Sequence, residues 1–205
     1  MLAQKLGSKR GLATSAAAIA AAGNAALADN DFEGVYVGLS FPVLAGGTNG
    51  DGSTSSDYDI SDMSPKIGLM AGYNQLFGAD DRWLFGGEVA FDPSVYKSDD
   101  YQLANSLTAK LKLGRVFGSD EGSFGKTLVY GFLSYGTTEF AFSDGTNYSS
   151  NRGSGIGVGV ETKINDHVSL GLEYHYQSLE YRNEYGYNYG TAKPQTLTFR
   201  TLVRF

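Results

Sequence analysis

The stretch VSLGLEYHY, residues 168–176, alternates apolar and polar side chains without a break. Successive side chains of a β-strand point to opposite faces, so Leu170 and Leu172 would share one face while Ser169 and Glu173 share the other. The final ten residues, TLTFRTLVRF, repeat the pattern. An amphipathic helix would need apolar residues every three or four positions, so this period of two predicts strands.

The same alternation recurs along the rest of the chain. It marks eight segments, at about 33–44, 66–76, 82–91, 104–116, 127–142, 154–163, 168–178 and 196–205. The connections between them alternate in length: short at 76–81 and 164–167, intermediate at 117–126, and long and rich in Gly, Ser, Asn, Asp and Tyr at 45–65, 92–103, 143–153 and 179–195. We therefore predict an all-β fold, an up-and-down antiparallel eight-stranded β-barrel with its short turns at one end.

The composition excludes several kinds of protein. The 205 residues include 28 Gly but only 4 Pro, without a three-residue glycine period, which excludes a collagen-like chain. The absence of Cys excludes disulfide scaffolds and thiolate chemistry, and the two histidines, His167 and His175, leave little room for a metal centre. We therefore expect no cofactor and no metal. The mean hydropathy of -0.22 is typical of a soluble protein, but it averages two strand faces of opposite character.

Residues 1–28 have the order of a secretory signal peptide. Three basic residues precede an uncharged, alanine-rich stretch, and Ala26 and Ala28 stand where signal peptidase would cut, just before Asp29. Such an alanine-rich stretch is marginal for a membrane-spanning anchor. We predict cleavage that leaves 29–205 as one barrel domain. Cleavage would lower the formal net charge from -6 to -9, which argues against a nucleic-acid partner.

The polar face of the strands separates two kinds of barrel. In a soluble barrel of the lipocalin type this face would meet water, whereas in a transmembrane barrel it lines the interior and the apolar face meets lipid. Acids and bases are equally frequent on it, and this balance favours a charge-paired interior. The predicted interior network consists of Glu88, Lys110, Lys112, Glu139, Glu161, Glu173, His175, Arg200 and Arg204. We expect His175 to bond to its acidic neighbours.

Aromatic residues gather near the predicted strand ends, where a membrane barrel places its aromatic girdles at headgroup level. Those predicted on the apolar face are Phe41, Tyr73, Phe77, Trp83, Phe85, Phe91, Tyr130, Phe140, Phe142, Tyr174 and Tyr176. Tyr36 falls on the polar face and is the counterexample. The aromatic pattern favours the transmembrane barrel over the soluble one.

Five stretches form a set that spans the chain: GVYVGLSF (34–41), IGLMAGYNQLFG (67–78), WLFGGEVAF (83–91), GVGVETKINDHVSLGLEYHY (157–176) and the terminal Phe205. Together they resemble the small eight-stranded outer-membrane β-barrel proteins of Gram-negative bacteria, the OmpA/opacity-like barrel family. The resemblance covers essentially all of 29–205 and implies an integral outer-membrane location. It also implies that the barrel-assembly machinery reads the last strand, where Leu197, Phe199, Val203 and Phe205 stand at the matching positions.

A lipid A-modifying enzyme is one alternative to a structural barrel. His167 and Ser169, followed by Glu173, are similar to the His-x-Ser plus Glu arrangement of outer-membrane lipid A deacylases, in which a base activates the serine. The match departs from that pattern because no Asn follows Ser169 and the Glu comes too soon. Ser169 and Glu173 would also lie on the inner face of one strand, away from lipid. We therefore expect no enzymatic activity, and the two histidines do not fit the rim site of an omptin-type protease either.

Three further motifs have both a functional and a structural interpretation. Glycines 153, 155, 157 and 159 alternate within a strand rather than link a strand to a helix, so they make room in a crowded barrel rather than bind a nucleotide. Asp51, Asp57, Asp59 and Asp62 lack the spacing of an EF-hand, which favours a solvated acidic loop over a calcium site. The segment 180–194 holds Tyr181, Tyr185, Tyr187 and Tyr189, which are equally compatible with contact to a partner and with packing on one another.

The sequence thus predicts an integral outer-membrane protein with a structural or surface role. Its apolar strand faces would contact membrane lipid and lipopolysaccharide, its paired charges would fill the interior, and its loops would meet a surface partner that the sequence does not identify. A small porin-like channel is the alternative function.

Overall fold

A computed structural model describes residues 32–50, 62–80, 82–97, 101–118, 126–142, 147–148, 150–182 and 188–205. Several predictions lie outside these residues: the signal peptide with Ala26 and Ala28, and the loop residues Asp51, Asp57, Asp59, Tyr185 and Tyr187. Across the described ranges, no helix is long and apolar enough to cross a membrane.

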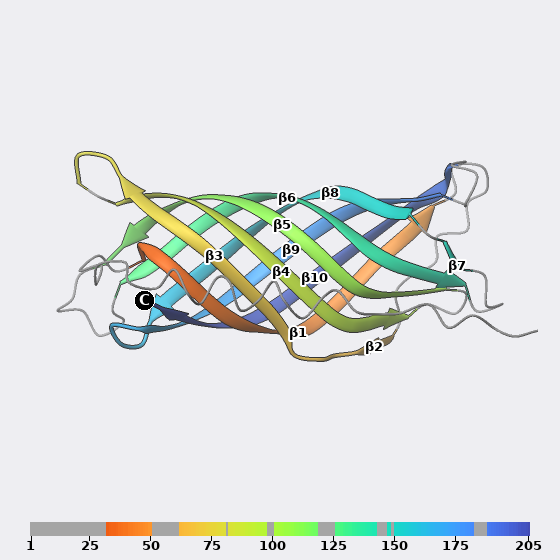
Figure 1. Cartoon of the computed structure of the whole chain (residues 1–205), viewed down its shortest axis with the longest axis horizontal. Helices are drawn as coiled ribbons and strands as arrows, with labels where there is room; N and C mark the ends of the chain where they lie inside the picture. Colours follow the sequence, from red (N-terminus) through yellow and green to blue (C-terminus); the bar gives the residue numbers. More distant parts are fainter. Residues whose placement is uncertain are drawn as a thin grey trace, which may run out of the picture.

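Eight long antiparallel strands close into a ring (Figure 1). They are β1 (Gly34–Gly50), β3 (Gly68–Phe77), β4 (Trp83–Lys97), β5 (Tyr101–Phe117), β6 (Thr127–Phe142), β8 (Ser150–Lys163), β9 (Val168–Arg182) and β10 (Asn188–Arg204). Each pairs with its neighbour along the chain, and β1 closes the ring against β10. Two short strands, β2 (Asp62–Ser64) and β7 (Asn147–Tyr148), add to the ends of β4 and β6. The predicted up-and-down eight-stranded barrel is confirmed.

The strands are longer than predicted at one end of the barrel. Most of the predicted connection 92–103 is strand, since β4 runs to Lys97 and β5 begins at Tyr101. The hairpin of β9 and β10 likewise takes up most of 179–195. These segments have the composition of loops. They are strands nevertheless, because their backbone groups pair with neighbouring strands, and this pairing does not depend on side-chain composition. The chain end lies at the opposite end of the barrel, with the short turns (Figure 1).

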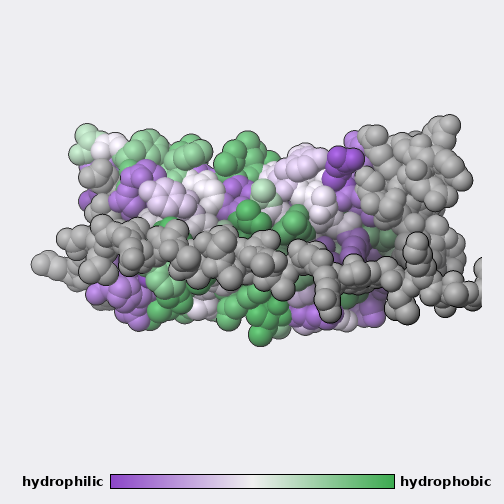
Figure 2. Space-filling model, viewed as in Figure 1, coloured by the Kyte–Doolittle hydropathy of each residue, from purple (hydrophilic) through white to green (hydrophobic). Residues whose placement is uncertain are grey.

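The outer wall of the barrel is apolar. Every strand of the ring contributes an outward apolar side chain that is 38% to 64% exposed: Leu39, Leu69, Val89, Leu111, Leu133, Ile156, Leu172 and Phe199. Figure 2 shows hydrophobic residues gathered along the middle of the wall, with hydrophilic residues toward both ends. A continuous apolar surface of this extent is unfavourable in water and fits the hydrocarbon of a bilayer. The wall therefore favours the transmembrane barrel over the soluble one.

Aromatic side chains occupy both faces of the wall. Those that the structure exposes as predicted are Phe41, Tyr73, Phe77, Trp83, Phe85, Phe91 and Tyr174. The prediction is wrong for Tyr130 and Phe140, which are 3% and 2% exposed and lie inside the barrel. The reason is the unbroken alternation of β6, in which even-numbered residues such as Phe132 face inward and odd-numbered ones such as Leu133 face outward. Tyr36 lies inside, as predicted.

Glycines of β8 make room for these inward rings. A Cβ atom added to Gly157 would overlap the ring of Phe132, and one added to Gly159 would overlap the ring of Tyr130. The two strands are hydrogen-bonded neighbours, and Gly159 lies directly beside Tyr130. The interpretation of this glycine run as a packing feature is confirmed.

Apolar layers occupy both ends of the interior. The layer at the short-turn end consists of Phe32, Leu84, Val116, Leu128, Tyr130 and Phe132. The layer toward the long-loop end consists of Tyr96, Leu103, Phe140, Leu179 and Ala192. The charged side chains around Arg200 lie at mid-height, between the long-loop layer and the short-turn end, whereas Arg204 and Glu161 lie at the level of the short-turn layer.

Candidate functional site

The interior charges come from five different strands. Inward positions of β4, β5, β8, β9 and β10 carry them, because the polar residue of each alternating pair points into the barrel. All are between 1% and 8% exposed: Glu88, Lys110, Lys112, Glu161, Glu173, Arg200 and Arg204. Seven of the nine predicted network residues are thus buried charges inside the barrel.

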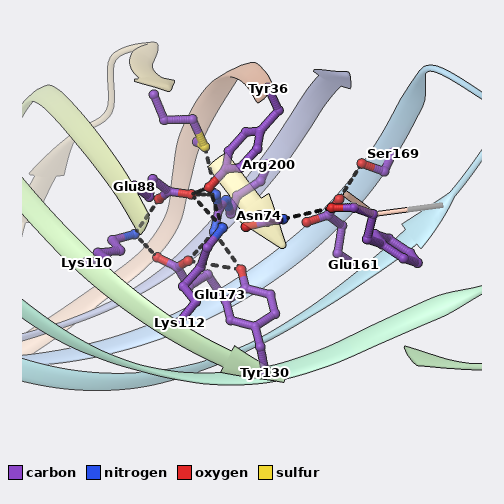
Figure 3. A network of polar contacts seen from close by, with 12 residues as sticks. Tyr36, Asn74, Glu88, Lys110, Lys112, Tyr130, Glu161, Ser169, Glu173 and Arg200 are labelled. Carbon is purple, nitrogen blue, oxygen red and sulfur yellow. Dashed lines mark hydrogen bonds and ion pairs between the residues drawn. The ribbon is translucent and has the colours of Figure 1, made fainter. Parts of the chain in front are cut away.

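Arg200 is the centre of the network (Figure 3). Its guanidinium group donates hydrogen bonds to the carboxylates of Glu88 and Glu173, which extend from different strands. It also donates to the hydroxyl of Tyr130. One side chain from β10 therefore links both central carboxylates, in the forked geometry that distinguishes Arg from Lys.

Two lysines of β5 surround the same carboxylates. Lys110 Nζ lies 3.2 Å from Glu88 Oε1 and also forms an ion pair with Glu173. Lys112 Nζ lies 3.3 Å from Glu88 Oε2 and donates to the hydroxyl of Tyr36, which in turn donates to Glu88 Oε2 at 2.7 Å. Each carboxylate is therefore compensated by at least two cations, as buried charges require.

Tyrosine rings complete this cluster. The Tyr130 hydroxyl donates to Glu173 Oε2 at 3.0 Å, and Lys112 Nζ lies 4.4 Å from the ring centroid of Tyr36 and 5.5 Å from that of Tyr130. A cation over an aromatic face is attracted to the ring, and the attraction is stronger away from water. The sequence predicts Tyr36 on the inner face without assigning it a role, and it predicts Tyr130 on the outer face.

A second group of polar contacts lies nearer the short turns. Arg204 pairs with Glu161, and Arg204 Nη1 donates to Ser169 Oγ at 2.6 Å. The Arg204 guanidinium also lies 5.1 Å from the ring centroid of Phe32, whose carbonyl accepts a hydrogen bond from Asn74 Nδ2 at 3.1 Å. Phe32, two residues before β1, is thereby held in the apolar layer at the end of the barrel.

The structure does not bring together the residues of the deacylase-like motif. Ser169 Oγ donates to Glu161 Oε1 at 2.5 Å and is fully buried in the interior. His167 lies in the exposed turn 164–167, where its backbone N–H donates to Asn165 Oδ1 at 2.9 Å. The described geometry therefore gives Ser169 a structural partner rather than a base.

His175 lies inside the barrel, but its partner differs from the prediction. Its Nε2 atom is 2.8 Å from Ser134 Oγ, and its ring centroid is 5.2 Å from that of Phe132. The expected hydrogen bond to a neighbouring acid is not among its described contacts.

The prediction for Glu139 is wrong. Glu139 is exposed on the outside of the barrel, where it accepts a hydrogen bond from Asn105 Nδ2 at 2.6 Å. Like the outward residues Leu133 and Tyr135, it has an odd number in the unbroken alternation of β6, so its side chain points outward. It lies close to the long-loop end of β6, past the apolar middle of the wall. A carboxylate at that height does not need to be inside.

Asp92, an acid outside the predicted network, lies inside the barrel instead. Asp92 faces a cavity of about 70 Å³ between the central charges and the apolar layer of the long-loop end. Its carboxylate accepts hydrogen bonds from the Tyr96 hydroxyl and from the backbone N–H of Ser94. With Asp92, the described interior again balances four acids against four bases. The alternation of β4 continues to Asp92, but the composition of 92–103 predicts a loop there.

The remaining predicted residues lie on the wall or at the long-loop end. Phe199, Val203 and Phe205 are 38%, 38% and 57% exposed on the outer face, and Leu197 is half-buried there. Their role as an assembly signal stays a prediction. Tyr181 and Tyr189 belong to the paired strands β9 and β10 rather than to a loop, and their side chains are outside the described part.

The chain matches one family model and several solved structures. The family described as "Outer membrane protein beta-barrel domain" matches residues 14–205. Among solved structures, Neisserial surface protein A (NspA) is 18% identical, with a TM-score of 0.48, and the match covers 83% of this chain and 97% of that one. Ail of Yersinia pestis is 15% identical, with a TM-score of 0.45 and coverages of 84% and 99%. OprG of Pseudomonas aeruginosa is 12% identical, with a TM-score of 0.41 and coverages of 86% and 98%. No curated protein matches the chain significantly.

Proposed function

The chain belongs to the family of outer-membrane β-barrel domains, and from this premise we propose that it is a non-conducting structural barrel of the Gram-negative outer membrane. In this proposal its wall contacts membrane lipid and lipopolysaccharide, and its long-loop end faces the cell surroundings. The barrel-assembly machinery would insert it by way of Leu197, Phe199, Val203 and Phe205.

The filled interior is the observation that carries this proposal. Arg200 is 1% exposed and spans the barrel between Glu88 and Glu173, which are 4% and 3% exposed. A conducting pore would leave such charges in contact with a continuous column of water. Apolar layers lie toward both ends of the interior, and a cavity of about 70 Å³ beside Asp92 lies between the central charges and the long-loop layer.

Single-channel recording in planar bilayers tests the proposal. The full chain, refolded in detergent, should give no discrete conductance steps. Two controls accompany the recording. Heat-modifiable migration in gels would show that the refolded protein is a folded barrel, and resistance to carbonate extraction would show that the barrel is integral to the membrane in cells. Discrete, reproducible steps would overturn the closed-barrel proposal and favour the porin-like alternative.

The tip of the β9–β10 hairpin is the part of the proposed surface with the most distinctive composition. Residues 183–187 include Tyr185 and Tyr187, and tyrosine provides large contact area at low entropic cost. Replacing 183–187 with a Gly/Ser segment of equal length keeps both strands. Cells that carry this variant should adhere less than cells with the native barrel at equal surface expression, and unchanged adhesion would remove the contact role.

A further inference from the structure

Arg115 lies on the outer side of the wall, close to the short turns. The outward residues of β5 run from Leu107 through Leu111 and Leu113, which are 48% to 59% exposed, to Arg115 at the short-turn end. Arg115 pairs directly across the sheet with Trp83. A charge on the lipid face is costly at the bilayer centre but costs little near the interface, so Arg115 marks the edge of the apolar belt.

Two aromatic rings flank the Arg115 guanidinium. Its central carbon lies 5.3 Å from the ring of Trp83 and 5.9 Å from the ring of Phe117. Both rings are on the outer wall, 41% and 49% exposed. Contact with ring faces uses the flat side of a guanidinium and leaves the N–H groups at its edge available.

Within the described residues, those N–H groups have a weak polar partner. A guanidinium has five donors, and in the described part of the chain the polar contact of Arg115 is an ion pair with Asp80 in which Nη2 and Oδ2 are 3.6 Å apart. This distance is too long for a hydrogen bond, and both side chains are more than 40% exposed, so the pair contributes little. The forked edge of Arg115 can therefore take a ligand that carries paired oxygens.

We infer that Arg115, Trp83 and Phe117 bind the phosphate of a phospholipid headgroup. Phosphate oxygens match the guanidinium fork, and aromatic rings prefer the headgroup level at which such a phosphate lies. The short turns of outer-membrane barrels face the periplasm, so the bound lipid belongs to the leaflet on that side. The inference rests on the proposed membrane role.

Phosphatidylglycerol titrated onto the full-length, folded barrel in micelles of a non-ionic detergent tests this site. Native mass spectrometry counts bound lipid, and Trp83, the only tryptophan of the chain, reports fluorescence changes at the site itself. Arg115→Gln should weaken lipid binding about tenfold, as expected for the loss of one charge-assisted contact. The lipid affinity of Arg115→Lys should lie between those of the native chain and Arg115→Gln, because Lys keeps the charge but lacks the forked donors.

Matched controls distinguish lipid binding at Arg115 from a general attraction of anionic lipid to positive charge at this end of the barrel. Arg82→Gln removes the same charge from the same end of the barrel, but Arg82 is exposed beside the turn and has neither ring over it in the described contacts. It should bind phosphatidylglycerol like the native chain. Diacylglycerol, which lacks the phosphate, should not bind at the site, and inorganic phosphate should not displace the lipid.

Four results would overturn the inference. They are native-like lipid binding by Arg115→Gln, an equal loss in Arg82→Gln, binding of diacylglycerol that depends on Arg115, and displacement by inorganic phosphate, which would indicate a free-anion site. Insertion into vesicles of phosphatidylethanolamine and phosphatidylglycerol, followed by the heat-modifiable gel shift, is measured in parallel. A barrel that does not insert contradicts the proposed function along with the site, whereas a barrel that inserts but shows no Arg115 effect contradicts the site alone.

Discussion

Replacing Arg200 with Met should strongly destabilise the folded barrel. Met keeps much of the side-chain length and leaves little cavity, so the main loss is electrostatic. Arg200 makes hydrogen bonds to two carboxylates that are no more than 4% exposed, and removing one partner of a buried ion pair costs about 3–5 kcal/mol. Lys110 still pairs with both carboxylates, so we expect a loss at the lower end of this range, about 3 kcal/mol.

Urea unfolding of the full chain in lipid vesicles measures this loss. Trp83, on the outer wall, reports the transition by fluorescence, and the heat-modifiable gel shift provides a second probe. Arg82→Met is the matched control, because it removes an exposed arginine and should stay within about 0.5 kcal/mol of the native chain.

A second substitution tests the cause. Glu173→Gln in the Arg200→Met background removes a carboxylate that has lost its main partner, so the two changes should couple favourably by about 1–3 kcal/mol. Glu139→Gln is the control for this step, because Glu139 lies on the outside and should not couple to Arg200. An Arg200→Met chain as stable as the native one would refute the reasoning, and so would equal rescue by Glu139→Gln.

Two further substitutions test the wall and the packing. Leu111→Lys places a charge in the apolar belt, where Leu111 is 59% exposed, and should cost about 2–4 kcal/mol in vesicles. A change of less than about 0.5 kcal/mol, as for a surface residue in water, would contradict a lipid-facing wall. Gly159→Val should cost about 1–3 kcal/mol by urea unfolding, because its side chain would overlap the Tyr130 ring. Gly46→Ala, with nothing within 4 Å of the added Cβ, is the control, and equal losses in both variants would contradict the packing argument.

The strand pattern of this barrel was predictable because lipid makes the alternation strict. In β9, Leu172 and Tyr174 face outward and Glu173 faces inward, as the sequence indicates. The irregularities were not predictable. A register shift between Ala104 and Leu107 in β5 includes Asn105 at a positive φ of 51°. Before this shift odd-numbered residues face inward, and after it even-numbered residues do. Such a bulge depends on how β6 pairs with β5, which is not a local property of the sequence.

The sequence predicts which types of residue line the interior, but it does not predict which of them contact each other. A buried lysine or arginine on a polar strand face needs an acid, so the network itself followed from the pattern. The identity of its partners depended on strands far apart in the chain: Tyr130 faces inward over Gly159 of β8, and its hydroxyl reaches Glu173 of β9. Glu139 shows the converse, since its charge predicted the inside while its parity in β6 placed it outside.

The charged interior also helps to fix the register of the strands, because it makes the two faces of a strand chemically different. A slip of one residue exchanges the faces of a strand, and if both faces were apolar, lipid would oppose such a slip very little. Here a slip of β10 by one residue would carry Arg200 and Arg204 to the wall, at a cost of about 2–4 kcal/mol for Arg200 near the bilayer midplane and less for Arg204, which lies near the short turns. A slip of two residues would keep the faces but separate Arg200 from Glu88 and Glu173. Apolar side chains of the same volume would fill the barrel as well, but the charges add a cost to each of these other registers.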